Sequence, residues 1–90
     1  MKVYLVGDYG PEHYNVKSVH RTKTGALKAW NRHRLYLLQD AKNSLKNHKN
    51  DKYYKDMLKE MIRNLSCKDP KKIDNGTQET PFIEEKEIEE

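Results

Sequence analysis

The feature that most constrains the fold is a run of apolar residues at helical spacing over residues 24–65, broken once near its middle. Before the break, one stripe recurs at steps of three or four residues and is apolar except at Arg34: Leu27, Trp30, Arg34, Leu38, Ala41 and Leu45. This spacing is typical of one face of an α-helix, and Thr22 or Thr24 can cap its N-terminus. The sequence therefore predicts a long amphipathic helix that begins near residue 24.

The break at residues 47–51 divides the run into two helices. Polar residues interrupt the apolar spacing there, and Asp51 can cap a second helix that continues to Leu65. At about 1.5 Å per residue, the first helix is roughly 35 Å long and the second roughly 22 Å long. We expect an antiparallel helical hairpin over residues 24–66. Because the two apolar stripes differ in length, part of the first helix needs another cover.

β-prone segments lie on both sides of this hairpin. Residues 2–6 precede a turn-forming loop, Gly7 to Pro11, and residues 14–20 form a second strand that pairs with the first. The last ten residues are either a third strand or an acidic tail, and we favour the strand because a two-stranded hairpin is marginal alone. The fold class is α+β, with a small antiparallel sheet packed against the helical hairpin in the element order β-β-α-α-β. The single domain spans residues 1–90: a strand hairpin (1–20), the helical hairpin (24–66), a connector (67–80) and the acidic closing strand or tail (81–90).

The composition allows only one small core. Apolar residues make up 34% of the chain and charged residues 36%. A core of this size gains stability from a partner chain, so self-association as a homodimer is a reasonable expectation. No apolar run approaches the length of a membrane span and no signal peptide is visible, which predicts a cytoplasmic protein without a membrane partner. The single cysteine, Cys67, is expected to be a structural thiol.

The charges are unevenly distributed along the chain. Residues 17–63 hold thirteen Lys or Arg and four Asp or Glu, a balance of +9, whereas residues 74–90 hold seven acids and one lysine, a balance of −6. Cations beside the apolar stripes of the helices can bind a polyanion such as nucleic acid. The alternative is an ordinary solvated helix surface that the acidic C-terminus partly neutralises. The candidate basic face consists of Lys28, Arg32, Lys42, Lys46, Lys52, Lys55, Lys59 and Arg63.

No catalytic constellation is visible, so we expect a non-enzymatic protein without a cofactor. The acids cluster in the C-terminal segment rather than beside a nucleophile or a second buried carboxylate. The four histidines lack metal-ligand spacing, and therefore no metal site is predicted. Trp30 and Tyr53 are aromatic candidates for a binding surface. The alternative for Trp30 is a place in the core.

Three segments carry a resemblance to a known group of proteins. Residues 1–6, residues 22–30 and residues 82–88 together resemble small uncharacterised proteins of phages and prophages. In that group a strand hairpin is followed by a helix and a closing acidic strand, and residues 34–67 here look like a helical insertion. The resemblance implies an accessory protein that binds and blocks a host protein, such as a defence component, without catalysis.

Three functions remain open from the sequence. The first is binding of a host protein through the helical hairpin, using an exposed apolar overhang of the first helix. The alternative is nucleic-acid binding by the basic face, gated by the acidic C-terminus. The third is sequestration of a small phosphorylated signal molecule in a pocket between subunits.

Overall fold

The computed structural model describes residues 1–47, 51–73 and 79–89. These residues form three strands and two helices. The strands make one antiparallel sheet with β1 in the centre, in the order β2-β1-β3. The predicted α+β class and the predicted element order are confirmed. The elements are β1 (Lys2–Tyr9), β2 (Tyr14–His20), α1 (Lys23–Asn47), α2 (Lys52–Leu65) and β3 (Thr80–Glu87).

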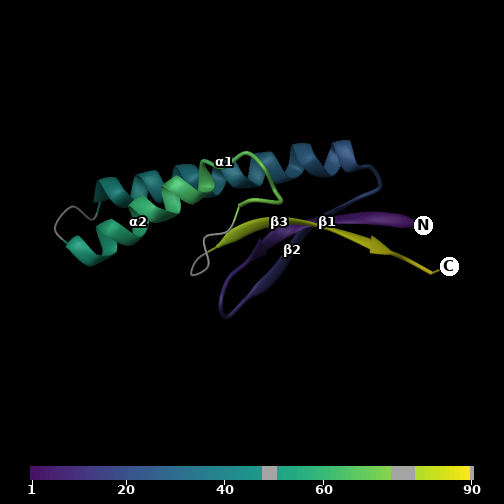
Figure 1. The fold of residues 1–90 in the computed structure, drawn as a ribbon, viewed down its shortest axis with the longest axis horizontal. Coiled ribbons are helices and arrows are strands. Elements are labelled where there is room, and N and C mark those ends of the chain that lie inside the picture. The colour runs from purple at the N-terminus through teal and green to yellow at the C-terminus, as the bar shows by residue number, and fades with distance from the viewer. Residues whose placement is uncertain (48–50, 74–78, 90) are drawn as a thin grey trace.

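The two helices lie side by side as the predicted hairpin (Figure 1). Thr22 caps α1, because its hydroxyl accepts a hydrogen bond of 3.1 Å from the Gly25 amide. Asp51 caps α2 in the same way, accepting from the Tyr54 amide at 3.1 Å. Most of the fold-back, residues 48–50 with His48, lies outside the described residues, as do residues 74–78 of the predicted connector.

Arg34 joins the end of α2 to the middle of α1. Its Nη1 donates a 2.7 Å hydrogen bond to the Leu65 carbonyl, and its Nη2 donates one of 2.8 Å to the side chain of Asn31. The guanidinium also lies 5.8 Å from the centre of the Trp30 ring. A cation at the C-terminal carbonyls of a helix is favourable because it meets the negative end of the helix dipole. This contact explains why a charged residue occupies a position on the buried stripe.

The sheet covers the part of α1 that extends beyond α2 (Figure 1). Ala26 and Trp30 are buried in one cluster with Val6 of β1, and Ile73 of the connector joins the same cluster. The expected additional cover of α1 is therefore the sheet. This cover buries Trp30 of the predicted apolar overhang, whereas Leu27 of the same stripe remains 38% exposed.

β1 is longer than predicted. It continues through Gly7, Asp8 and Tyr9, which the sequence had indicated as part of a loop, and the turn begins at Gly10, whose amide bonds the His13 carbonyl at 3.0 Å. Pairing with both β2 and β3 holds these three residues in the strand. The predicted closing strand is confirmed as β3, which begins one residue before the predicted segment 81–90 and ends at Glu87.

Candidate functional site

The strand β2 presents its apolar side chains away from the helices. Val19 pairs with Leu5 and Val16 pairs with Gly7 of β1. Directly paired residues of an antiparallel sheet point to the same face. Because Val6 of β1 packs in the helix-side cluster, its neighbours Leu5 and Gly7 face the opposite side. The two valines therefore lie on the face of the sheet that no described helix covers (Figure 1).

This uncovered face carries a cluster of aromatic side chains. The rings of Tyr14 and Phe82 are stacked with their centres 4.9 Å apart, and the rings of Tyr9 and Phe82 are 6.2 Å apart. Side chains of β2 are strongly exposed there, with 55% of Tyr14, 44% of Val16 and 58% of Val19 accessible to solvent. We call this surface the outer face, which consists of Leu5, Tyr9, Tyr14, Val16, Val19 and Phe82.

A β-bulge at Lys17 aligns the apolar residues of β2. The register shifts between Val6 and Gly7, so that Val16 and Val19, three positions apart, fall on the same face. Without the extra residue, strict alternation would place one of them against α1. The bulge needs a glycine opposite it, because a Cβ added to Gly7 would lie 1.8 Å from the Asn15 carbonyl oxygen.

The side of β2 that faces α1 is polar. Ser18 and His20 point to this side, and their side chains share a hydrogen bond of 2.7 Å. In an antiparallel sheet with helices on one face, apolar residues are expected toward the helices and polar residues toward water. β2 has the opposite arrangement. A strand that leaves its apolar side in water is typical of an interface with another molecule.

Both edges of the sheet resist pairing with an additional strand. The bulge disturbs β2 at its centre. On β3, Pro81 lacks a backbone N–H, and four consecutive charged residues, 84–87, follow it. Bulges, prolines and charges are the usual protection of edge strands. Binding is therefore favoured at the outer face rather than by strand addition at an edge.

A polar cluster lies between the sheet and α1. The Asp8 side chain is buried, and its two oxygens bond the Nε2 atoms of His13 at 3.1 Å and of His33 at 2.7 Å. Sequence reasoning missed this cluster, because Asp8 was assigned to a turn. The sequence did contain a signal: Asp8 follows Tyr4 and Val6 at a spacing of two residues. Residues at this spacing in a strand point to the same face, so Asp8 points inward with them. Among the described residues, no three acidic, histidine or cysteine side chains converge as a metal site.

A groove runs between β2 and α1 beside this cluster. Its first part is a hollow of about 330 Å³ whose lining includes Lys17, Arg32, His33 and Tyr36. A second hollow of about 260 Å³ shares three of these residues and adds the acids Asp8, Asp40 and Glu79. The groove therefore has a cationic end and an acidic end. The apolar floor of the first hollow consists of Val6 and Ala29.

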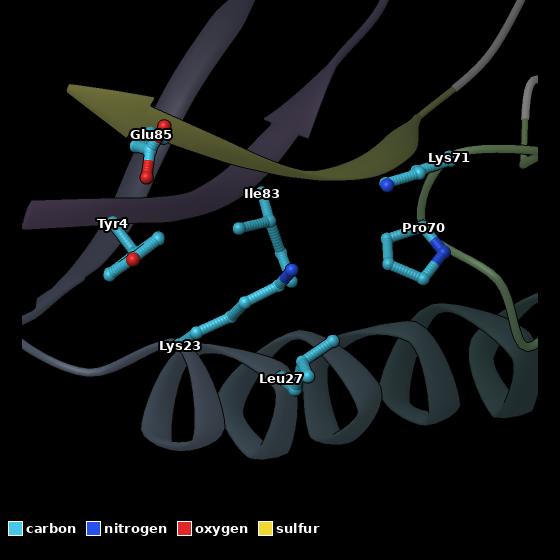
Figure 2. A pocket seen from close by; sticks show the side chains of 7 residues that line it. All are labelled: Tyr4, Lys23, Leu27, Pro70, Lys71, Ile83 and Glu85. Atoms are coloured by element: carbon cyan, nitrogen blue, oxygen red, sulfur yellow. The ribbon is translucent and has the colours of Figure 1, made fainter.

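A third hollow lies at the other end of the sheet, under the first turns of α1. Figure 2 shows Lys23 and Lys71 extending into it from opposite sides, with Ile83 between them. Its volume is about 300 Å³. Glu85 adds a carboxylate to the rim and is paired with Lys2 at 3.7 Å. This hollow is a weaker candidate for a ligand site than the groove. Its lining has charges of both signs, and its described residues form no hydrogen-bonded cluster like that of Asp8.

The chain has no significant match among known protein families, curated proteins or solved structures. Neither helix is long and apolar enough to cross a membrane within the residues that the structure describes. The candidate sites are consequently defined by geometry and chemistry alone.

The eight residues of the predicted basic face belong to α1 and α2. Seven of its side chains are exposed and Lys55 is partly buried. None of the eight forms an ion pair with another described residue. Tyr53 is 82% exposed and available to a partner, whereas Trp30 is 1% exposed and belongs to the core. Of the two interpretations of Trp30, the core position is the one observed.

Proposed function

We propose that this chain is a non-catalytic, phage-type accessory protein that binds a host protein and modulates it. The observation that carries the proposal is the reversed orientation of β2, which directs Val16 and Val19 away from the helices. The resemblance of the strands and the first helix to phage accessory proteins supports a host protein as the partner. The site of action is then the cytoplasm of the host bacterium.

The outer face has the chemistry of a protein interface. Tyrosine and phenylalanine supply much of the binding energy at such surfaces, and Tyr9, Tyr14 and Phe82 are already clustered here. The hydroxyl of Tyr14 donates to Glu84, which fixes the ring beside Phe82. A fixed ring loses little side-chain entropy on binding. The matching host surface is apolar at its centre, with a polar rim.

The test uses three versions of the full-length chain as bait in bacterial lysate. The first is unaltered, the second carries Val16→Ser and Val19→Ser, and the third carries Lys42→Ala and Lys46→Ala as a control on the exposed side of α1. We expect one stoichiometric host protein with the first and third baits and its loss with the second. The purified partner must then bind the purified chain with the same dependence on the two valines.

Two results would overturn the proposal. One is capture that the valine substitutions leave unchanged, because the outer face would then be irrelevant. The other is the absence of a stoichiometric partner together with a concentration-dependent dimer, detected by sedimentation, that the valine substitutions abolish. In that case the outer face is the interface between two copies of this chain.

Nucleic-acid binding by the basic face is a second candidate function. The specific support is that eight cations on the helices lack ion pairs within the described part of the chain. Such binding weakens steeply with salt, because each neutralised phosphate releases a counterion. Fluorescence anisotropy with mixed oligonucleotides near 50 mM salt tests it. Equal binding by the unaltered chain and by a Lys52→Ala, Lys55→Ala, Lys59→Ala, Arg63→Ala variant, or no binding at all, eliminates this candidate.

A further inference from the structure

We infer that the groove between β2 and α1 is a binding site for a nucleotide, with the phosphate at the Lys17 and Arg32 end. This inference goes beyond the proposed protein partner and does not depend on it. The groove is built by the inner side of β2, whereas the outer face is built by the opposite side of the same strand. The bulge at Lys17 contributes to both surfaces, because it places Val16 and Val19 on the outer face and Lys17 in the lining of the groove.

The cationic end of the groove suits a phosphate. Lys17 and Arg32 line this end from β2 and from α1, and Ser18 belongs to the same lining. Among the residues that the structure describes, no acidic side chain lines this hollow. A guanidinium presents parallel N–H donors that match phosphate oxygens, and an ammonium adds a compact charge. Two cations on separate elements can therefore hold one phosphate from two sides.

His33 is held in place for a ligand by the buried carboxylate of Asp8. The 2.7 Å contact uses Nε2, and Nδ1 of the same ring has no hydrogen bond to another residue in the described part of the chain. His13 occupies the other oxygen of Asp8 at 3.1 Å, which fixes the carboxylate in turn. An imidazole oriented by a carboxylate is a common arrangement at binding sites, because the second contact restrains the ring.

The rest of the groove suits the base of a nucleotide. Tyr36 is 68% exposed, and its ring lies nearly parallel to that of His33, with an interplanar angle of 9° and 6.4 Å between the centres. An exposed aromatic ring offers a stacking surface for any base. Asp40, which lines the far end, can accept hydrogen bonds from an amino group and repels a second phosphate. This polarity fits one phosphate and one amino-bearing base better than a polyphosphate.

The test is a titration of the ¹⁵N-labelled full-length chain, followed by NMR, with adenosine monophosphate, tripolyphosphate and a single-stranded DNA dodecamer as separate probes. We expect saturable shifts at residues 17, 18, 32, 33 and 36 with the mononucleotide. Arg32→Ala should weaken its binding about tenfold or more, since a charge-assisted hydrogen bond is lost. Tyr36→Ala should weaken it roughly fivefold or more through lost stacking. The control Lys71→Ala removes an exposed cation from the hollow in Figure 2 and should change nothing.

The DNA probe distinguishes a free nucleotide from a nucleotide within a single strand. Tighter binding of the dodecamer at the same groove residues identifies a nucleotide within a single strand, and tighter binding of adenosine monophosphate identifies a free nucleotide. The inference is overturned if no probe gives saturable shifts in the groove. It is equally overturned if tripolyphosphate binds more tightly than adenosine monophosphate, or if Lys71→Ala weakens binding as much as Arg32→Ala, since a general attraction to cations would then explain the result.

Discussion

Substitution of Gly7 by alanine tests the bulge on which both candidate surfaces depend. A Cβ at this position would lie 1.8 Å from the Asn15 carbonyl oxygen, 2.8 Å from its carbon and 3.0 Å from the Val16 Cα. Heavy atoms pack best at about 3.5–4.0 Å, so the backbone of β2 would have to retreat by roughly 2 Å. All three obstructing atoms belong to the backbone. A side-chain rotation therefore cannot relieve the clash.

The expected cost is at the upper end of the overpacking range, about 3 kcal/mol. For a domain of this size each kcal/mol corresponds to about 4–8 °C, which gives a fall in Tm of about 12–24 °C. Thermal unfolding followed by circular dichroism measures this fall.

The matched control for this experiment is Gly25→Ala. Its nearest contact would be the Thr22 side-chain oxygen at 3.0 Å, and alanine favours the first turn of α1. The control should change Tm by less than about 5 °C, because a helix propensity gain of about 1 kcal/mol offsets the tight contact. If Gly7→Ala lowers Tm no more than Gly25→Ala does, the assigned register of β1 and β2 is incorrect.

Three further predictions concern single contacts. Arg34→Ala should destabilise the chain by about 2–4 kcal/mol in urea unfolding, because a buried carbonyl loses a charged donor, and a change below about 1 kcal/mol would contradict this role. The hydrogen bond to Glu84 raises the pKa of Tyr14 from 10.0, so its stabilising contribution is present at neutral pH and disappears as the pH rises through the folded-state pKa. Absorbance titration should show one tyrosine ionising earlier in Glu84→Gln, and superimposable curves would refute the contact. Val16→Ser and Val19→Ser should each alter stability by no more than about 0.5 kcal/mol, since both side chains lie at the surface, and a larger loss in urea unfolding would indicate burial.

The helices and their ends were predictable from the sequence because the determinants are local. Apolar spacing of three and four residues fixes the buried face of each helix, and Thr22 and Asp51 cap the two N-termini as predicted. The order of strands and helices follows from the same local patterns. The element that covers the rest of α1 was not predictable from the sequence. Only the tertiary packing shows that the sheet lies over the length of α1 that α2 does not reach.

The candidate surfaces were not predictable in the same way. Val16 and Val19 are three residues apart, a spacing that signals a bulge in a strand but does not indicate which face of the sheet they occupy. Asp8 and His33 are 25 positions apart in the sequence, and only the packing of β1 against α1 brings their side chains within 2.7 Å. Glycines on both sides of Asp8 favoured a turn, and pairing with two neighbouring strands overrode that local preference.

Both candidate surfaces depend on the orientation of β2, whose apolar side chains point away from the helices into solvent. Methyl NMR of the isolated chain with a soluble paramagnetic probe measures this directly. We expect strong relaxation of the Val16 and Val19 methyl groups, with nuclear Overhauser contacts from Val19 to Leu5 and none to α1. Protected Val19 methyl groups with contacts to Ala29 or Trp30 would contradict this orientation.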